Sequence, residues 1–351
     1  MRRCIYLVFA LLLLLAPAQA ENTEILLTFT GDCTLGGEDR LRSRPYSFDS
    51  YILAHGYAYP FEKVQQLLAH DDVTVINLEN VFYPYERNRI LRTYNFRGPT
   101  DFVRILSEGS VELAYLGNNH TGDYGRQGLK STISTLEAAG LAWFGVPFPN
   151  KLATWTFEKN GIKVGFTGCY IGQWGRDSQG LRDTFIDLRQ QGCAVVVAVM
   201  HGGTEYAARQ DGNQERFARF LVNQGADLVV GHHPHVLHGV ERVGSANVVY
   251  SLGNFSFGGN AALRATQTML AQVRLSFDAQ GEYLGQQLNL IPAHPSGTLE
   301  FNNYQPVPVE GTEAQAIIDL VGAQSNYPLN PYQEGIGALQ DFLPASQAAN
   351  P

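Results

Sequence analysis

The sequence predicts an α/β protein built around a largely parallel sheet. From residue 24 onward, short apolar runs alternate with amphipathic runs, which is the pattern of consecutive strand–helix–strand units. The apolar runs that we predict as strands cover residues 25–30, 73–76, 113–116, 195–200, 226–230 and 248–250. Between them, apolar residues return at helical spacing, as Leu129, Ile133 and Leu136 do. A strand–helix alternation of this kind favours a sheet covered by helices.

Two antiparallel hairpins are also expected. Residues 154–158 and 162–168 flank Asn160-Gly161, a dipeptide typical of tight hairpin turns, and residues 269–277 and 283–291 flank the turn 278–281. A short helix near 314–321 follows. The tail from Gln324 onward is rich in Pro, Asn, Gln and Ala, which predicts weak order. We therefore divide the chain into one domain over 21–300 and a partly disordered extension over 301–351.

The first twenty residues have the pattern of a cleaved secretory signal. Arg2 and Arg3 precede an apolar run over 5–16, and Ala18-Gln19-Ala20 has the small-x-small form of a cleavage site. Export to the periplasm or the cell surface is therefore expected. Without this segment, 23 of the 25 basic residues remain against 33 acidic ones, a net charge of −10. This charge argues against nucleic acid as a partner.

Unusual polar residues follow six of the predicted strands. They are Asp32, Glu79, Asn119 with His120, His201, the histidines of 232–238, and Asn254. Ligands of open α/β sheets bind beyond the carboxyl ends of the strands, so these side chains are expected to converge. Carboxylates, an amide and imidazoles together suit one or two divalent metal ions, which we expect to be Mn, Zn, Fe or Mg.

Each candidate ligand could instead have a purely structural role. Asp32 could form an Asx turn, Glu79 could pair with an arginine of the loop 82–98, and Asn119 could support a turn. His120 could be a buried histidine with satisfied hydrogen bonds. His201 differs because six apolar residues precede it. A charged imidazole there would be strongly desolvated, which favours a neutral, metal-bound form.

The stretch 232–238 contains His232, His233, His235 and His238. We expect His235, which lies beyond Pro234, to be a ligand. His232 and His233 compete for a second position, and His233 is alternatively a substrate contact. His238 is expected to lie outside the site on spacing alone.

Six motifs, taken in order, resemble the CapA family, a capsule-synthesis and poly-γ-glutamate-associated group related to calcineurin-like metallophosphoesterases. The motifs are Gly31-Asp32, Asn77-Leu78-Glu79, Asn118-Asn119-His120 with Asp123-Tyr124-Gly125, His201-Gly202-Gly203-Thr204-Glu205-Tyr206, Gly231-His232-His233-Pro234-His235-Val236, and Tyr250-Ser251-Leu252-Gly253-Asn254-Phe255. The resemblance covers about residues 24–260. It implies a metallophosphoesterase-like fold, a four-layer α-β-β-α sandwich.

The resemblance also suggests roles for individual residues. His120 would be the general acid, with Asp123 orienting its imidazole, and Glu79 would bridge metal ions. Arg97, Glu205 and Asn254 would contact substrate, with a surface ion pair as the alternative for Arg97. The chain departs from the metallophosphoesterase pattern at Thr34, where those enzymes have a histidine, so that one metal position would be weaker or absent.

The function implied is that of an exported, metal-dependent hydrolase or transferase. Its substrate would be a phosphoester or an amide of a polyglutamate-like or cell-wall polymer, and membrane proteins of capsule synthesis would be partners. Two alternatives belong to other classes. A non-catalytic polymer-binding or assembly factor would keep the fold without the chemistry. A metal-storage protein would not need the aromatic and arginine-rich loop 82–98.

Overall fold

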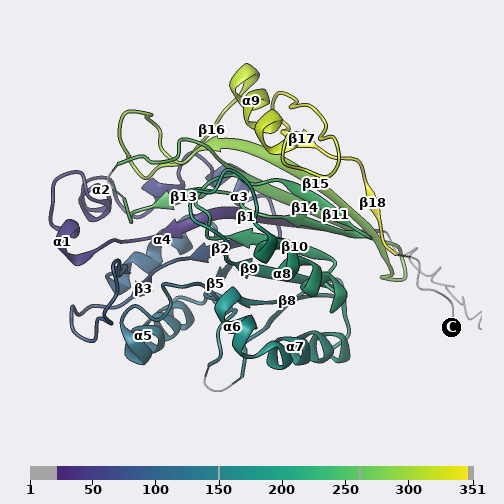
Figure 1. The fold of residues 1–351 in the computed structure, drawn as a ribbon, viewed down its shortest axis with the longest axis horizontal. Coiled ribbons are helices and arrows are strands. Elements are labelled where there is room, and N and C mark those ends of the chain that lie inside the picture. Colours follow the sequence, from purple (N-terminus) through teal and green to yellow (C-terminus); the bar gives the residue numbers. More distant parts are fainter. Residues whose placement is uncertain (1–21, 149–150, 261, 347–351) are drawn as a thin grey trace, which may run out of the picture.

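The computed structural model describes residues 22–148, 151–260 and 262–346. The predicted signal segment lies outside the described residues. Within them, strands form two main sheets with helices packed against both (Figure 1). The mixed α/β class predicted from the sequence is confirmed. No helix in the described part of the chain is long and apolar enough to cross a bilayer.

The larger sheet is mixed, with ten strands. They are β1 (Thr23–Thr34), β2 (Val73–Leu78), β5 (Leu113–Tyr115), β6 (Ala142–Phe144), β13 (Asn254–Phe257), β14 (Thr268–Phe277), β15 (Tyr283–His294), β16 (Val307–Pro308), β17 (Ala338–Leu339) and β18 (Leu343–Pro344). The main order is β16-β15-β14-β1-β2-β5-β6, and β13 pairs with β1. The pairs β1–β2, β2–β5, β5–β6 and β1–β13 are parallel, so their carboxyl ends lie at one edge.

The smaller sheet has six strands in the order β11-β12-β10-β9-β8-β7. They are β7 (Trp155–Lys159), β8 (Ile162–Tyr170), β9 (Cys193–His201), β10 (Leu228–His232), β11 (Val240–Val243) and β12 (Ala246–Val249). Strands β8, β9, β10 and β12 run parallel. The predicted hairpin between β7 and β8 is confirmed, and Asn160 (φ 54°) and Gly161 (φ 79°) adopt the positive φ that its tight turn requires.

Nine helices in the described residues pack around the sheets. They are α1 (Asp39–Arg42), α2 (Phe48–His55), α3 (Gln65–Leu68), α4 (Val103–Glu108), α5 (Gly125–Ala138), α6 (Ile171–Arg176), α7 (Ser178–Gln190), α8 (Gly212–Asn223) and α9 (Gly311–Gly322), with two 3-10 turns, η1 (Tyr59–Phe61) and η2 (Thr100–Phe102). Of these helices, α2, α4, α5, α7 and α8 cover the outer faces of the sheets. A small parallel pair, β3 (Val81–Phe82) with β4 (Arg97–Gly98), joins the ends of the arginine-rich loop. This pair holds the loop beside the end of β2.

Three hydrophobic clusters hold these elements together. The largest contains residues of both sheets, such as Val75 on β2 and Val197 on β9. A second packs α2, α4 and α5 on the larger sheet, and a third packs α7 and α8 on the smaller one. Helix α9 contributes Ile317 and Ile318 to the cluster between the sheets rather than to an outer layer. The strict four-layer order therefore stays a prediction.

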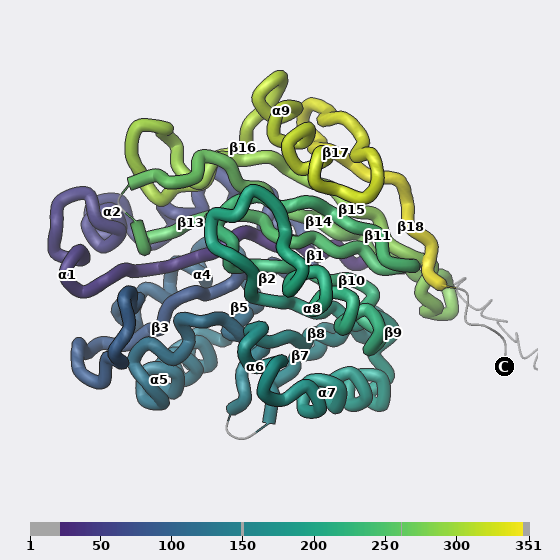
Figure 2. Tube along the Cα trace, in the orientation of Figure 1, coloured from purple at the N-terminus to yellow at the C-terminus, as the bar shows by residue number. Residues whose placement is uncertain are grey.

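The segment after β16 contributes two short strands that the sequence analysis did not predict. Ala338–Leu339 and Leu343–Pro344 both pair with β15, and Ala338 is fully buried. Figure 2 shows this segment, in yellow, running beside the strands of the larger sheet. The expectation of weak order from Gln324 onward stays a prediction, although these two short strands add to the edge of the larger sheet. Backbone pairing with a sheet edge needs no apolar sequence, so composition did not reveal it.

Candidate metal centre

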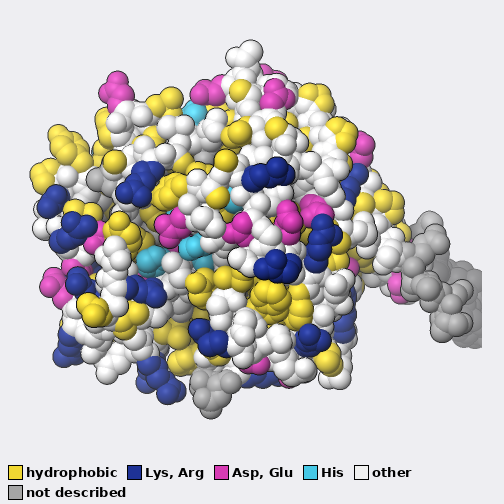
Figure 3. All heavy atoms as spheres, in the orientation of Figure 1, with side chains coloured by type: hydrophobic (Ala, Val, Ile, Leu, Met, Phe, Trp, Pro, Cys, Tyr) yellow, Lys and Arg dark blue, Asp and Glu magenta, His cyan; other side chains and the backbone are white. Residues whose placement is uncertain are grey.

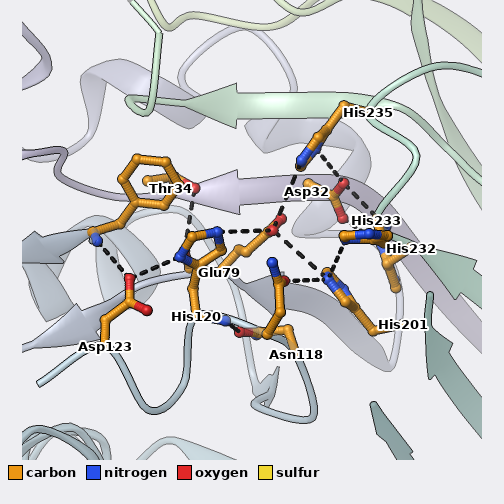
Figure 4. Close-up of polar contacts among 12 residues, drawn as sticks. Asp32, Thr34, Glu79, Asn118, His120, Asp123, His201, His232, His233 and His235 are labelled. Atoms are coloured by element: carbon orange, nitrogen blue, oxygen red, sulfur yellow. Dashed lines mark hydrogen bonds and ion pairs between the residues drawn. The ribbon is translucent and has the colours of Figure 1, made fainter. Parts of the chain in front are cut away.

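Polar residues from both sheets meet where the parallel strands end. Asp32 of β1 lies in register with Asn77 of β2 and with Asn254 of β13. In the smaller sheet, His201 at the end of β9 lies in register with His232 at the end of β10. The predicted convergence is therefore present in the structure (Figure 4). We call the residues that meet there the histidine cluster, or simply the cluster: Asp32, Glu79, His201, His232, His233 and His235. On the face shown in Figure 3, histidine side chains reach the surface near its middle, with acidic and basic side chains around them.

A glycine lets β13 approach β1 at this edge. A Cβ on Gly31 would lie 2.2 Å from the Gly253 carbonyl oxygen, which is closer than any real contact. The next residue, Asp32, donates its backbone N–H to the same carbonyl over 2.8 Å. The Gly31-Asp32 pair is thus required for the strand contact that fixes Asp32 in the site.

Asp32 is fully buried and connects the two sheets. Its Oδ1 accepts a hydrogen bond from Asn77 Nδ2 (2.8 Å) and lies 3.1 Å from His232 Nδ1, while its Oδ2 lies 3.0 Å from His235 Nδ1. Burial by itself would raise the pKa of Asp32. The hydrogen bonds and charges of His232 and His235 outweigh burial and hold this pKa well below its ordinary value. Asp32 is therefore a fixed negative charge at the base of the cluster.

Glu79, just after β2, is buried and unpaired. Both of its carboxylate oxygens lack a hydrogen-bond partner in the described structure. Its Oε1 lies 3.7 Å from His201 Nε2, 3.9 Å from His235 Nε2 and 4.0 Å from His120 Nε2. These separations are too long for hydrogen bonds. Burial, followed by the charge of Asp32, raises the pKa of Glu79 well above its ordinary value. A buried carboxylate without partners costs much free energy unless a cation neutralises it.

Three groups of side chains have ligand atoms close enough to share an ion. Within each group these atoms all lie within 4.8 Å of one another. The groups are Glu79, His201 and His233; Asp32, Glu79 and His235; and Glu205, His233 and His235. Two ligands at about 2.1 Å from one tetrahedral ion are about 3.4 Å apart, close to the Glu79–histidine separations. The residues present therefore fit a divalent metal, and Glu79 belongs to two groups.

His201 has the properties of a neutral ligand. Its Nε2 lies 2.7 Å from Asn119 Oδ1 and 3.1 Å from His233 Nδ1. Burial, followed by the charge of His233, lowers the pKa of His201 well below its ordinary value. Burial and the charge of His235 likewise lower the pKa of His233 to about 4. Both imidazoles are therefore neutral at pH 7, the form that binds metal ions.

The turn around Pro234 is strained. His233 (φ 101°) and His235 (φ 61°) both have positive φ, a conformation that non-glycine residues seldom adopt. The turn is held by the N–H of Tyr206, which donates to the Pro234 carbonyl over 2.8 Å. Figure 4 shows the imidazoles of His233 and His235 directed toward Asp32 and Glu79. The Nε2 of His238 instead lies 3.0 Å from the Ala207 carbonyl oxygen. His238 thus lies outside the cluster, as its spacing in the sequence predicts.

His120 and Asp123 form a fixed pair beside the cluster. His120 Nδ1 lies 2.7 Å from Asp123 Oδ2, and its Nε2 faces Glu79. The Asp123 carboxylate also accepts the N–H of Phe96 (2.6 Å) and Nη1 of Arg92 (2.7 Å). The ring of Phe96 packs against the imidazole, with centroids 4.4 Å apart. The carboxylate therefore holds the Nδ1 proton and leaves Nε2 directed into the site.

The remaining predicted substrate contacts lie at different places. Arg97 is buried, and its Nε lies 2.5 Å from Asp39 Oδ1, so its guanidinium is engaged outside the cluster. Asn254 is buried next to Asp32, and its Oδ1 has no hydrogen-bond partner in the described residues. Glu205 is exposed at the edge of the cluster. Contact of these residues with substrate stays a prediction.

Sequence reasoning missed three residues that shape the site. Asn77 bonds to Asp32, Asn118 Nδ2 bonds to Asn77 Oδ1 (3.0 Å), and Arg92 binds Asp123. Alternation along a strand was a usable signal for Asn77, because residues 77 and 79 point to the same side. Arg92 had no such signal, since the loop 82–98 contains four arginines at irregular spacing.

The fold and the cluster together define an α/β protein with a buried histidine–carboxylate centre suited to divalent metal. A family model described as "Bacterial capsule synthesis protein PGA_cap" matches residues 26–259. The chain belongs to this capsule-synthesis family, and the CapA-type resemblance of its motifs is confirmed.

Two proteins from Bacillus species are among those similar to this chain. "Capsule biosynthesis protein CapA" of Bacillus anthracis is 28% identical over 259 residues, which cover 68% of this chain and 61% of that protein. "PGA biosynthesis protein CapA" of Bacillus subtilis is 25% identical over 284 residues, covering 76% and 72%. The chain thus spans about six tenths of the first relative. Among solved structures, a putative 5'-nucleotidase from Staphylococcus aureus in complex with alpha-ketoglutarate has a TM-score of 0.46 and 13% identity, covering 89% of this chain and 61% of that one.

Proposed function

We propose that this chain is a metal-dependent hydrolase or transferase of capsule synthesis, which acts on a phosphoester or on an amide of a polyglutamate-like polymer. The buried, unpartnered carboxylate of Glu79 carries this proposal. A protein that only supported the fold would gain stability by replacing it with an apolar residue. Its retention beside neutral imidazoles favours a bound cation.

One or two divalent ions would be held by the groups around Glu79. Asp32 and His235 would complete one position, and His201 with His233 would complete the other. A bound ion acts as a Lewis acid that polarises a substrate oxygen and lowers the pKa of a coordinated water. The chain itself supplies the fixed charge of Asp32 and excludes bulk water from Glu79, since neither residue is exposed.

His120 would supply the proton that the leaving group needs. Its Nδ1 is engaged by Asp123, so Nε2 is the atom free to donate toward the cluster. Asn118 Oδ1 accepts the backbone N–H of His120 over 3.0 Å and fixes the residue's backbone. A general acid positioned in this way typically contributes about 10²–10⁴-fold to the rate.

The decisive experiment compares metal content and turnover in His201→Ala. Protein purified without chelator is analysed for metals and screened with phosphoesters and γ-glutamyl amides. We expect the variant to lose both bound metal and turnover, because it removes a neutral ligand from the Glu79 group. His70→Ala is the matched control, since His70 is exposed and the hydrogen bond of its Nδ1 is to the Gln66 carbonyl, far from the ligand groups in sequence. Full metal retention in His201→Ala would contradict the assignment.

A non-catalytic polymer-binding or assembly factor is the second candidate. Thr34 favours it, because this hydroxyl donates to the Glu79 carbonyl over 3.3 Å where metallophosphoesterases have a histidine. One metal position would then be weak. Stoichiometric metal without turnover on either substrate class would favour this role over catalysis.

We also propose that the protein is exported and acts with membrane proteins of capsule synthesis on an anionic polymer. The charge and apolar pattern of residues 1–20 support export, and the similarity to the CapA proteins of two Bacillus species supports capsule synthesis. N-terminal sequencing of the protein from its native host checks export. A mature chain that begins at Glu21 is expected, and an intact Met1 in all fractions would argue against cleavage.

A further inference from the structure

A cavity adjoins the histidine cluster. It has a volume of about 340 Å³ and lies between the segment 206–208, the residues that follow His235, the segment 264–267 and the end of α9. The ring of Tyr206 forms part of its wall and packs against His235, with centroids 5.7 Å apart. The cavity and the candidate metal centre therefore share one aromatic side chain.

The charge of this cavity differs from that of the protein. Its lining contains no Asp or Glu, although the whole chain has a net charge of −8. Arg264 is the one charged side chain in the lining, and its guanidinium lies 5.5 Å from the centroid of the Tyr206 ring. Within the described residues, no carboxylate forms an ion pair with Arg264. A guanidinium that lies beside an aromatic ring and has no carboxylate partner is suited to bind an anion.

The rest of the lining is suited to an aliphatic chain with an amide. Val236, Leu237 and Leu320 provide apolar surface in the lining. Gln324, also in the lining, has a buried Oε1 without a hydrogen-bond partner in the described structure. Such an acceptor is satisfied by an N–H donor of a ligand.

We propose that this cavity is a substrate subsite that binds a carboxylate carried on a short aliphatic, amide-bearing stem. Arg264 binds the carboxylate, Tyr206 positions the guanidinium, and Gln324 accepts the amide N–H. The inference rests on the proposed function, because a substrate subsite needs a reacting centre beside it and the proposed function supplies that centre. It adds that specificity comes from an arginine outside the metal cluster and outside the loop 82–98.

The test is a binding titration with the full chain and a fluorescent probe, dansyl-4-aminobutanoate. Arg264→Gln should weaken its binding by about tenfold or more, because a charged hydrogen-bonding pair is lost. The carboxamide analogue of the probe should bind weakly to the wild type and should not respond to the substitution. Arg209→Gln is the matched control, since it removes an exposed arginine that directly follows the lining segment 206–208 and does not itself line the cavity.

Two outcomes would overturn the proposal. Equal binding of the acid and its carboxamide, or equal binding by wild type and Arg264→Gln, would show that Arg264 recognises no carboxylate here. Competition by inorganic phosphate that is stronger than competition by butanoate and is lost in Arg264→Gln would assign the subsite to phosphate instead. The titration involves no turnover, so an inactive wild type would contradict the proposed function and leave this result unaffected.

Discussion

Asp123 provides a way to separate proton transfer from metal binding. Its carboxylate holds Nδ1 of His120, but it belongs to none of the three ligand groups. Asp123→Asn keeps the size of the side chain and leaves its amide unable to accept from His120, Phe96 and Arg92 together. We expect turnover to fall by about 10²–10⁴-fold through loss of the oriented imidazole, while metal content remains that of the wild type. Rates on a substrate with a good leaving group and elemental analysis provide the two readouts.

The leaving group of the substrate provides the control for this prediction. Because a good leaving group needs little protonation, the loss should be smaller for nitrophenyl substrates than for alkyl ones. Equal losses on both would assign Asp123 to a structural role. A fall in metal content would place it in the ligand system instead.

The residues of the site were predictable to the extent that strand geometry determines them. Asp32, Glu79, His201 and the histidines around the end of β10 all lie at or just after the carboxyl ends of parallel strands, so convergence required only the direction of those strands. The choice among the clustered histidines was not predictable. It depends on the positive φ of His233 and His235, which a turn stabilised by Tyr206 imposes.

A half-buried acid, Asp71, lies just before β2 and should make stability depend on pH. Burial raises the pKa of Asp71 from 3.8 to about 7, and the charges of Glu112 and Asp72 act in the same direction. Because the folded protein binds this proton more tightly than the unfolded chain, the associated stability is present below about pH 4 and is lost as pH rises through about 7. Asp71→Asn should remove this loss, since an amide oxygen still accepts from Thr74 Oγ1.

Urea unfolding at pH 5.5 and pH 8.5 tests this prediction. The gain in midpoint from Asp71→Asn should be larger at the higher pH. Glu300→Gln is the matched control, because Glu300 is exposed, and it should shift neither midpoint. An equal effect of Asp71→Asn at both pH values would show that this carboxyl group ionises normally.

Elements with local signals were predicted better than their arrangement. Asn160-Gly161 identified the β7–β8 hairpin, because a tight turn needs residues that tolerate positive φ. The division of the strands between two sheets was not visible in the apolar pattern, since strands buried on both faces look alike in either sheet. The pairing of β17 and β18 with β15 was missed for a related reason, as it rests on backbone groups that every residue carries.

The candidate centre draws its ligands from both sheets, so the packing of the sheets and the geometry of the centre are linked. Asp32 and Glu79 come from the larger sheet, whereas His201 and His233 follow strands of the smaller one. Any ion bound by such a set stabilises the packed molecule, because the unfolded chain does not bring these residues together. A substitution in the hydrophobic cluster that both sheets share should therefore change the free energy of unfolding and the metal affinity together.

Ile317 of α9 tests whether the C-terminal segment is part of that core. It is fully buried in the cluster between the sheets, and its neighbour on the helix, Val321, is buried as well. Ile317→Ala should lower the free energy of unfolding by about 2–5 kcal/mol, the usual cost of such a cavity. Thr312→Ala, on the exposed part of the same helix, should change it by about 0.5 kcal/mol or less. Urea unfolding followed by far-ultraviolet circular dichroism measures both. If α9 were only a loosely attached extension, the two variants would unfold like the wild type. If it is integral, Ile317→Ala shifts a single transition of the whole domain, because the side chain contacts a core that both sheets share.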